Sequence, residues 1–219
     1  MERLTQRQVL QLSQLAEVKR VFNIAYLTSK SVHAPCIMVT SARRGEGKTT
    51  TTALLAACAA QPPARRVLAV DLNWHQPALH ACFGLERSFN IDEFREEQSI
   101  DGLVRPTSVP GLDVLTAPPP IDETRSASLD ALDVGLMILE KARARYEWVF
   151  VDSNAIIPPN RRMIDPVVVS QATSGVIVVV LASVTSRQDV KRTVAGLETS
   201  GSNVVGTFVN QWRNPLYST

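Results

Sequence analysis

Several features that would point to a membrane, metal-binding or secreted protein are missing from this sequence of 219 residues. Its most hydrophobic run, residues 176–182, is far too short to cross a bilayer. The polar N-terminus predicts no signal peptide. The three cysteines, Cys36, Cys58 and Cys82, have no metal-ligand spacing, and their apolar contexts predict buried free thiols in a reducing compartment. We therefore expect a cytoplasmic protein with no membrane span of its own.

An excess of charge of one sign is also missing. The chain has 23 basic and 21 acidic residues and a formal net charge of +2, which gives no support for a dedicated nucleic-acid binder. By contrast, apolar residues are plentiful at 45%, which is enough for a packed core. The length fits one α/β domain, or one domain with an extra arm.

The most informative segment is Thr-Ser-Ala-Arg-Arg-Gly-Glu-Gly-Lys-Thr-Thr, residues 40–50. It contains a phosphate-binding P-loop of the form Ala-x-x-x-x-Gly-Lys-Thr. Gly45 and Gly47 let the backbone curl so that its N–H groups point at phosphate oxygens. Lys48 provides a positive charge for the β- and γ-phosphates, and the Thr49 hydroxyl is a suitable ligand for Mg²⁺.

The surroundings of this loop support nucleotide binding. The apolar run 36–39 precedes the loop and predicts a buried strand, and a helix of small residues is predicted over 49–60. A strand, a loop and a helix in this order place the helix N-terminus beneath the phosphates.

We expect the whole chain to divide into an N-terminal helical arm, residues 1–33, and a P-loop domain, residues 34–219. Apolar residues at helical spacing predict one helix over 5–29, packed on the outside of the domain or on another subunit. Core strands are predicted at 37–40, 67–71, 149–152, 176–181 and 204–210, with an additional strand at 112–115. Further helices are predicted at 77–83, 129–145, 164–172 and 187–199.

This alternation predicts a doubly wound α/β fold. The strands are almost continuously apolar, which indicates a mostly parallel sheet with helices on both faces. Five prolines in the segment 87–128 predict irregular or extended chain there.

Polar residues end three of the predicted strands. Asp71 and Asp152 would lie near the P-loop, because ligands bind at the carboxyl ends of strands in open α/β sheets. Their carboxylates could hold Mg²⁺ directly or through water, although each Asp could also cap a turn. Asn210 could recognise an adenine edge or form a strand-end turn.

Four ordered segments resemble the cytoplasmic kinase domain of bacterial tyrosine kinases of capsule and exopolysaccharide export, within the ParA/MinD class of P-loop ATPases. Residues 40–49, with the Gly-Glu-Gly-Lys core, are similar to that family's Walker A segment. Residues 70–80 resemble its Walker A′ segment, 146–153 its Walker B segment and 205–210 its closing strand. The resemblance implies the ParA/MinD-like P-loop fold.

The chain departs from the family pattern around the expected site. Arg43 replaces the ParA/MinD signature lysine, and its charge could meet phosphate or solvent. In Walker A′, Asn73 replaces the second Asp and His75 replaces the Arg. Asn154 and Ala155 replace a pair of prolines after Walker B.

Two further departures concern assembly and phosphorylation. The family's Glu-x-x-Arg-x-x-Arg motif for ring assembly is present as Glu17 and Arg20, but Asn23 occupies its third position. The resemblance therefore implies a homo-oligomer formed through the N-terminal helix. Where the family's autokinases end in a tyrosine cluster, this chain has only Tyr217.

The resemblance implies an Mg·ATP-dependent tyrosine-kinase-type phosphotransferase of exopolysaccharide or capsule synthesis. The predicted metal ligands are Thr49, Asp71 and Asp152, and the predicted catalytic residues are Lys48 and Asp71. The residues predicted to bind the nucleotide are Arg43, Arg44, Gly45, Glu46, Gly47, Lys48, Thr49, Thr50 and Asn210.

Two alternatives stay open. The first is a catalytically weak or inactive nucleotide-binding regulator of a membrane polysaccharide co-polymerase, which the changes at Asn73, His75 and Ala155 favour. The second is a ParA/MinD-like regulatory ATPase that dimerises on ATP, against which Arg43 counts. For the kinase and for the inactive regulator, the expected partner is the cytoplasmic tail of the co-polymerase. This partner would bring the protein to the inner face of the membrane.

Overall fold

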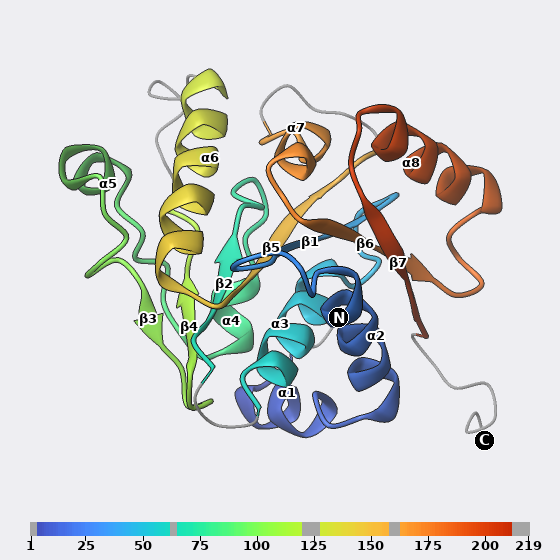
Figure 1. Cartoon of the computed structure of the whole chain (residues 1–219), viewed down its shortest axis with the longest axis horizontal. Coiled ribbons are helices and arrows are strands. Elements are labelled where there is room, and N and C mark those ends of the chain that lie inside the picture. The colour runs from blue at the N-terminus through green and yellow to red at the C-terminus, as the bar shows by residue number, and fades with distance from the viewer. Residues whose placement is uncertain (1–3, 62–64, 120–127, 158–162, 212–219) are drawn as a thin grey trace.

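The computed structural model of the protein describes residues 4–61, 65–119, 128–157 and 163–211. Across these ranges one seven-stranded sheet forms, in the order β3-β4-β2-β5-β1-β6-β7 (Figure 1). All neighbouring strands pair in parallel except β3 and β4. The strands are β1 (Cys36–Ser41), β2 (Val67–Asp71), β3 (Arg105–Pro106), β4 (Leu112–Leu115), β5 (Trp148–Ala155), β6 (Gly175–Leu181) and β7 (Val204–Asn210).

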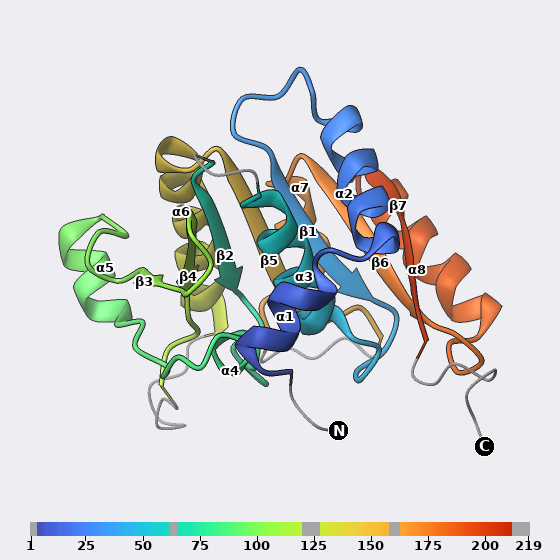
Figure 2. The ribbon, with the colours of Figure 1, turned by 90° about the horizontal axis from the view of Figure 1, so that it is seen from below.

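Helices cover both faces of the sheet, which confirms the predicted doubly wound fold. The helices are α1 (Gln6–Leu12), α2 (Ala16–Thr28), α3 (Lys48–Ala59), α4 (Leu79–Cys82), α5 (Ile91–Glu97), α6 (Ser128–Arg145), α7 (Pro166–Gln171) and α8 (Arg187–Thr199). The first four lie on one face, and α6, α7 and α8 lie on the other (Figures 1 and 2). Helix α5 lies beyond the β3 edge of the sheet (Figure 1).

The central strand β1 shows why the core strands are apolar throughout. Ile37 and Val39 contribute to the hydrophobic cluster beneath α3, whereas Cys36 and Met38 contribute to the cluster beneath α6. Successive side chains of a strand point to opposite faces, so a strand covered on both sides buries every residue. All six residues of β1 are buried.

The prediction of a single helix over 5–29 is wrong. Helix α1 ends at Leu12, and α2 begins at Ala16. Ser13 lies at the break, where its hydroxyl donates a hydrogen bond of 2.8 Å to the Leu10 carbonyl and so competes with helical bonding. Both helices pack against α3, and their buried side chains, including Val9 and Phe22, join the same core as α3.

The prediction of irregular chain over 87–128 is wrong over Ile91–Glu97, which form α5. The Asn90 side chain accepts hydrogen bonds from the Asp92 and Glu93 amides and starts this helix, and Gln98, at φ 54°, ends it. The helix has seven residues, too few to give a clear apolar period. The predicted additional strand over 112–115 is present as β4, paired with β2. Residues 120–127 of this segment lie outside the described ranges.

Among the residues that the structure describes, no helix is long and apolar enough to cross a membrane.

Candidate functional site

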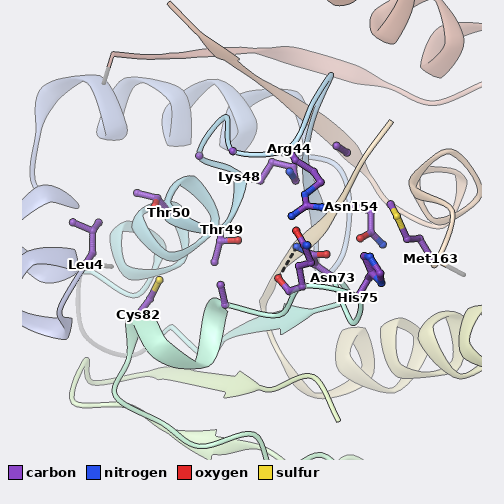
Figure 3. A pocket seen from close by; sticks show the side chains of 15 residues that line it. Leu4, Arg44, Lys48, Thr49, Thr50, Asn73, His75, Cys82, Asn154 and Met163 are labelled. Atoms are coloured by element: carbon purple, nitrogen blue, oxygen red, sulfur yellow. Dashed lines mark hydrogen bonds between the residues drawn. The ribbon is translucent and has the colours of Figure 1, made fainter. Parts of the chain in front are cut away.

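A cavity of about 260 Å³ lies where the loop between β1 and α3 faces the turn that follows β2 and the end of β5. The loop side contributes Arg44, Gly45, Gly47, Lys48, Thr49 and Thr50. The opposite wall includes Asn73, His75, Asn154 and Met163 (Figure 3). Leu4 and Cys82 lie at the far end of the cavity from Met163 (Figure 3).

The loop has the backbone conformation that a P-loop requires. Gly45 and Gly47 have φ values of 80° and 100°, a region that favours glycine. A Cβ atom on Gly47 would lie 2.4 Å from Asn210 Nδ2, so the space also demands glycine at this position. Helix α3 starts at Lys48, immediately after Gly47. Its first amides and its positive dipole end therefore border the cavity, as a phosphate site needs.

Lys48 is held in place by a contact within the protein. Its side chain is buried, and its Nζ donates a hydrogen bond of 3.3 Å to Ser41 Oγ at the end of β1. Burial lowers the pKa of the Lys48 ammonium, whereas the nearby Asp152 and Glu46 oppose that shift. An anion in the cavity would supply the charge partner that this cation needs.

Thr49 lines the cavity and contacts Asp152, which lies behind it and does not itself line the cavity. Thr49 Oγ1 donates a hydrogen bond of 2.6 Å to Asp152 Oδ2, while Asp152 Oδ1 is buried without a hydrogen-bond partner. Burial raises the pKa of Asp152 to about 6, and the bonds to Thr49 and the charge of Lys48 counteract it.

These oxygens fit a magnesium ion. Mg²⁺ prefers hard oxygen ligands and is commonly held by one or two carboxylates together with phosphate oxygens. The orphaned Asp152 Oδ1 would gain a partner on metal binding. No group of three or more His, Cys, Asp or Glu side chains suitable for a metal occurs within the described ranges, so water and phosphate oxygens would complete the coordination of Mg²⁺.

Asp71 lies beside Asp152, but its carboxylate is turned to the backbone. Oδ1 accepts a hydrogen bond of 3.0 Å from the Asn73 amide, and Oδ2 accepts one of 3.1 Å from the Leu79 amide. Burial and the charge of Asp152 raise the pKa of Asp71 well above its usual range. Its side chain thus shapes the turn into α4 and does not line the cavity. The roles of Asp71 as metal ligand and catalytic residue stay predictions.

Asn73 and Asn154, which replace family residues beside Walker A′ and Walker B, donate side-chain hydrogen bonds to backbone carbonyls. Asn73 Nδ2 donates to the Gln76 carbonyl over 3.1 Å, and Trp74 Nε1 donates to the Asp71 carbonyl over 2.8 Å. Asn154 Nδ2 donates to the Ile164 carbonyl over 3.0 Å. Asn73 and His75 nevertheless line the cavity and give that wall no carboxylate.

Three residues predicted to bind nucleotide do not line the cavity and instead contact other parts of the protein. The Arg43 guanidinium forms a two-point ion pair with Asp189, at 2.8 and 3.3 Å. The Glu46 carboxylate accepts hydrogen bonds from the Arg43 amide and the Thr185 hydroxyl. Asn210 Nδ2 donates to the Glu46 carbonyl over 3.1 Å. Their contacts with nucleotide stay predictions, whereas the other predicted binding residues reach the cavity.

Sequence reasoning missed Ser41, Thr185 and Asp189. Ser186 and Asp189 have the spacing of a helix N-cap, and the Ser186 side chain does accept from the Asp189 amide over 3.0 Å. That spacing predicts the start of α8, but nothing in the sequence pairs it with a loop about 140 residues earlier.

Comparisons with known proteins agree with this geometry. A family model for the CobQ/CobB/MinD/ParA nucleotide binding domain matches residues 37–218. The tyrosine-protein kinase YwqD of Bacillus subtilis is 29% identical over 175 residues, which cover 80% of this chain and 71% of that protein.

Two solved structures show the same fold. The kinase domain of the Escherichia coli tyrosine kinase ETK has a TM-score of 0.77 at 21% identity, covering 92% of this chain and 78% of that one. The septum site-determining protein MinD from Pyrococcus horikoshii, complexed with Mg-ADP, has a TM-score of 0.62 at 18% identity, covering 80% of this chain and 69% of that one.

Proposed function

We propose, from the fact that the chain belongs to the CobQ/CobB/MinD/ParA nucleotide-binding domain family, that it binds Mg·ATP and acts as a tyrosine-kinase-type phosphotransferase. The observation that carries this proposal is the contact between Thr49 and Asp152 beside a preformed P-loop. Homology to a bacterial tyrosine kinase, and the Mg-ADP bound by a protein of the same fold, support the choice of ligand.

The residues of the site divide the work between phosphate and metal. The amides around Gly45 and Gly47 and the first turn of α3 would bind phosphate oxygens, and Lys48 would neutralise their charge. Thr49 and Asp152 would hold Mg²⁺, which when bound offsets charge on the β- and γ-phosphates. Phosphoryl transfer needs mostly positioning and charge neutralisation, so these residues meet its main demands.

Asp71 would act indirectly, by positioning the cavity wall on the side where the acceptor hydroxyl would enter. Its bonds to the Asn73 and Leu79 amides fix the turn that carries Asn73 and His75 into the cavity wall. An Asp71 carboxylate with a raised pKa can accept a proton, yet its two backbone bonds restrict it to a small movement.

The cellular role that we propose is in exopolysaccharide or capsule synthesis and export. The partner would be the cytoplasmic tail of a membrane polysaccharide co-polymerase, which would localise the protein to the inner face of the membrane. Homology to YwqD supports the kinase ancestry on which this role depends. Self-association through the helix that carries Glu17 and Arg20 is part of the same proposal.

A catalytically weak or inactive regulator is the second candidate. Two observations favour it: both oxygens of Asp71 accept backbone hydrogen bonds, and Asn73 places an amide on the cavity wall. A ParA/MinD-like ATPase is a third reading, and the pairing of Arg43 with Asp189 counts against it because it turns that cation away from the cavity.

Incubation with Mg·[γ-³²P]ATP beside a Lys48→Met control tests these readings. For the kinase we expect label on tyrosine, with Tyr217 as the first candidate, and loss of label in the control. ATP binding without label would instead support the inactive regulator. Release of free phosphate that rises steeply with protein concentration would support a dimerising ATPase.

A further inference from the structure

The most unexpected group near the phosphate site is a buried carboxylate inside the loop itself. Glu46 is 2% exposed, although it follows Gly45 and precedes Gly47 in a loop whose amides would bind anions. A negative charge there opposes phosphate binding, and burying a charge costs free energy unless hydrogen bonds compensate. Of residues 44–50, all of which the structure describes, Glu46 alone does not line the cavity.

Both oxygens of Glu46 are used behind the loop. Oε2 accepts a hydrogen bond of 2.8 Å from the Arg43 amide, and Oε1 accepts one of 2.5 Å from the Thr185 hydroxyl. Thr185 Oγ1 in turn accepts 2.9 Å from the Leu181 amide at the end of β6. The carboxylate thus connects the start of the loop to the connection between β6 and α8.

Two further contacts strengthen this connection. Asn210, at the end of β7, donates a hydrogen bond of 3.1 Å from its side-chain Nδ2 to the Glu46 carbonyl. The Arg43 guanidinium pairs with Asp189 in the first turn of α8. The loop is therefore bound to the neighbouring part of the sheet at several points.

We propose that Glu46 is a positioning residue that holds the P-loop in its phosphate-binding shape through the Thr185 hydroxyl. This inference rests on the proposed nucleotide binding and deepens it. A loop held by Glu46 and Thr185 does not have to order itself when the nucleotide arrives, so the ordering cost is removed from the binding free energy. Hydrogen bonds to a charged group are the strong kind, so a single hydroxyl at Thr185 can have a measurable effect.

The test is titration of the whole chain with Mg·ATP and with inorganic pyrophosphate in calorimetry. Thr185→Val should weaken both ligands about ten-fold, since one charge-assisted bond contributes roughly 1.4 kcal/mol or more. Thr185→Ser keeps the hydroxyl and should bind within about two-fold of the wild type. Thr207→Val, at an exposed position on β7, is the matched control for replacing threonine by valine and should also bind normally.

The thermal midpoint of each variant without ligand separates positioning from folding. A purely structural role for Thr185 would lower the midpoint and leave the affinity for pyrophosphate unchanged at a temperature where the protein is folded. Wild-type affinity in a folded Thr185→Val variant would overturn the role of Glu46. If the wild type bound neither ligand, the proposed nucleotide binding and this inference would fall together.

The isosteric Glu46→Gln variant keeps the proposal testable even if Thr185→Val does not fold. It should weaken both ligands, because a neutral amide loses the charge assistance, but by less than Thr185→Val, because it also removes a negative charge that opposes phosphate binding. The double variant combines Glu46→Gln with Thr185→Val. We expect it to lose no more affinity than the weaker-binding single variant, since both changes break the same hydrogen bond between Glu46 and Thr185. Losses that simply add, or Glu46→Gln binding as tightly as the wild type, would contradict the proposal.

Discussion

Asp71 and Asp152 lie opposite each other as register partners on β2 and β5, and both carboxylates are buried. Burial raises the pKa of both groups, and their proximity adds to the shift at Asp71. The site therefore contains negative charge that the folded protein holds at a cost when no cation is bound.

This pair predicts an unusual pH dependence of stability. The pKa of Asp152 is raised to about 6 in the folded state. The folded protein then binds more protons than the unfolded one between about pH 4 and 6, so stability from this group falls as pH rises through that window. Relative to Asp152→Asn, the wild type should lose unfolding free energy from pH 4 to pH 7, by on the order of 1–3 kcal/mol.

Urea denaturation of both proteins at several pH values measures this change. Added Mg·ATP should stabilise the wild type more at pH 7 than at pH 5, because a deprotonated Asp152 binds the metal. A difference that is constant with pH would contradict the raised pKa.

The metal should depend on Thr49 as well as on Asp152. The measured quantity is the ratio of ATP affinity in Mg²⁺ to ATP affinity in EDTA. We expect Thr49→Val and Asp152→Asn each to lower this ratio about ten- to a hundred-fold, a change of roughly 1.4–3 kcal/mol. Calorimetry with and without Mg²⁺ gives this ratio. Thr50→Val is the control, since Thr50 borders the cavity, whereas the hydroxyl that bonds Asp152 belongs to Thr49. An unchanged ratio in Thr49→Val would exclude this hydroxyl as a ligand.

Arg43 and Arg44 should differ in their effect on ATP binding. Arg43 is paired with Asp189 at an exposed position, so we expect Arg43→Gln and Asp189→Asn to change ATP affinity by less than about three-fold. Arg44 borders the cavity, and Arg44→Gln should weaken ATP more than either. If Arg43→Gln lost affinity while Asp189→Asn did not, Arg43 would have to leave Asp189 and meet phosphate.

The two loop glycines form a matched pair for a backbone test. Gly45→Ala introduces only the strain of a positive φ, because nothing lies within 4 Å of its Cβ position. Gly47→Ala has the same strain and also meets Asn210 Nδ2. We expect about 1–2 kcal/mol of destabilisation for Gly45→Ala and a clearly larger loss for Gly47→Ala. Equal losses in denaturant unfolding would mean that Asn210 moves aside freely.

The N-terminal arm should be required for stability more than for binding. Phe22 is buried against Trp148, with ring centroids 5.3 Å apart, and Arg65 lies over its ring. Phe22→Ala should cost about 3–5 kcal/mol of unfolding free energy. Leu27→Ala, at a position that is 66% exposed in the same helix, should cost little. ATP affinity at low temperature should be normal in both variants, and a loss confined to Phe22→Ala would implicate the arm in the site.

Much of the fold could be predicted from the sequence because its signals are local. The apolar runs of β1, β2 and β5 and the small-residue helix α3 lie close to their predicted positions. The break at Ser13 and the helix α5 could not be predicted with the same ease. Both depend on single side-chain bonds to the backbone that do not alter the apolar pattern.

The candidate site shows the same division. The loop from Gly45 to Thr49 is contiguous, and its chemistry can be read from residue types alone. The family, the fold and the loop residues that line the cavity could thus be predicted from the sequence alone. Only the tertiary structure decided that Glu46 bonds Thr185, that Arg43 pairs with Asp189 and that Asp71 holds the turn before α4. Those contacts depend on where distant strands end in space, which no local pattern encodes.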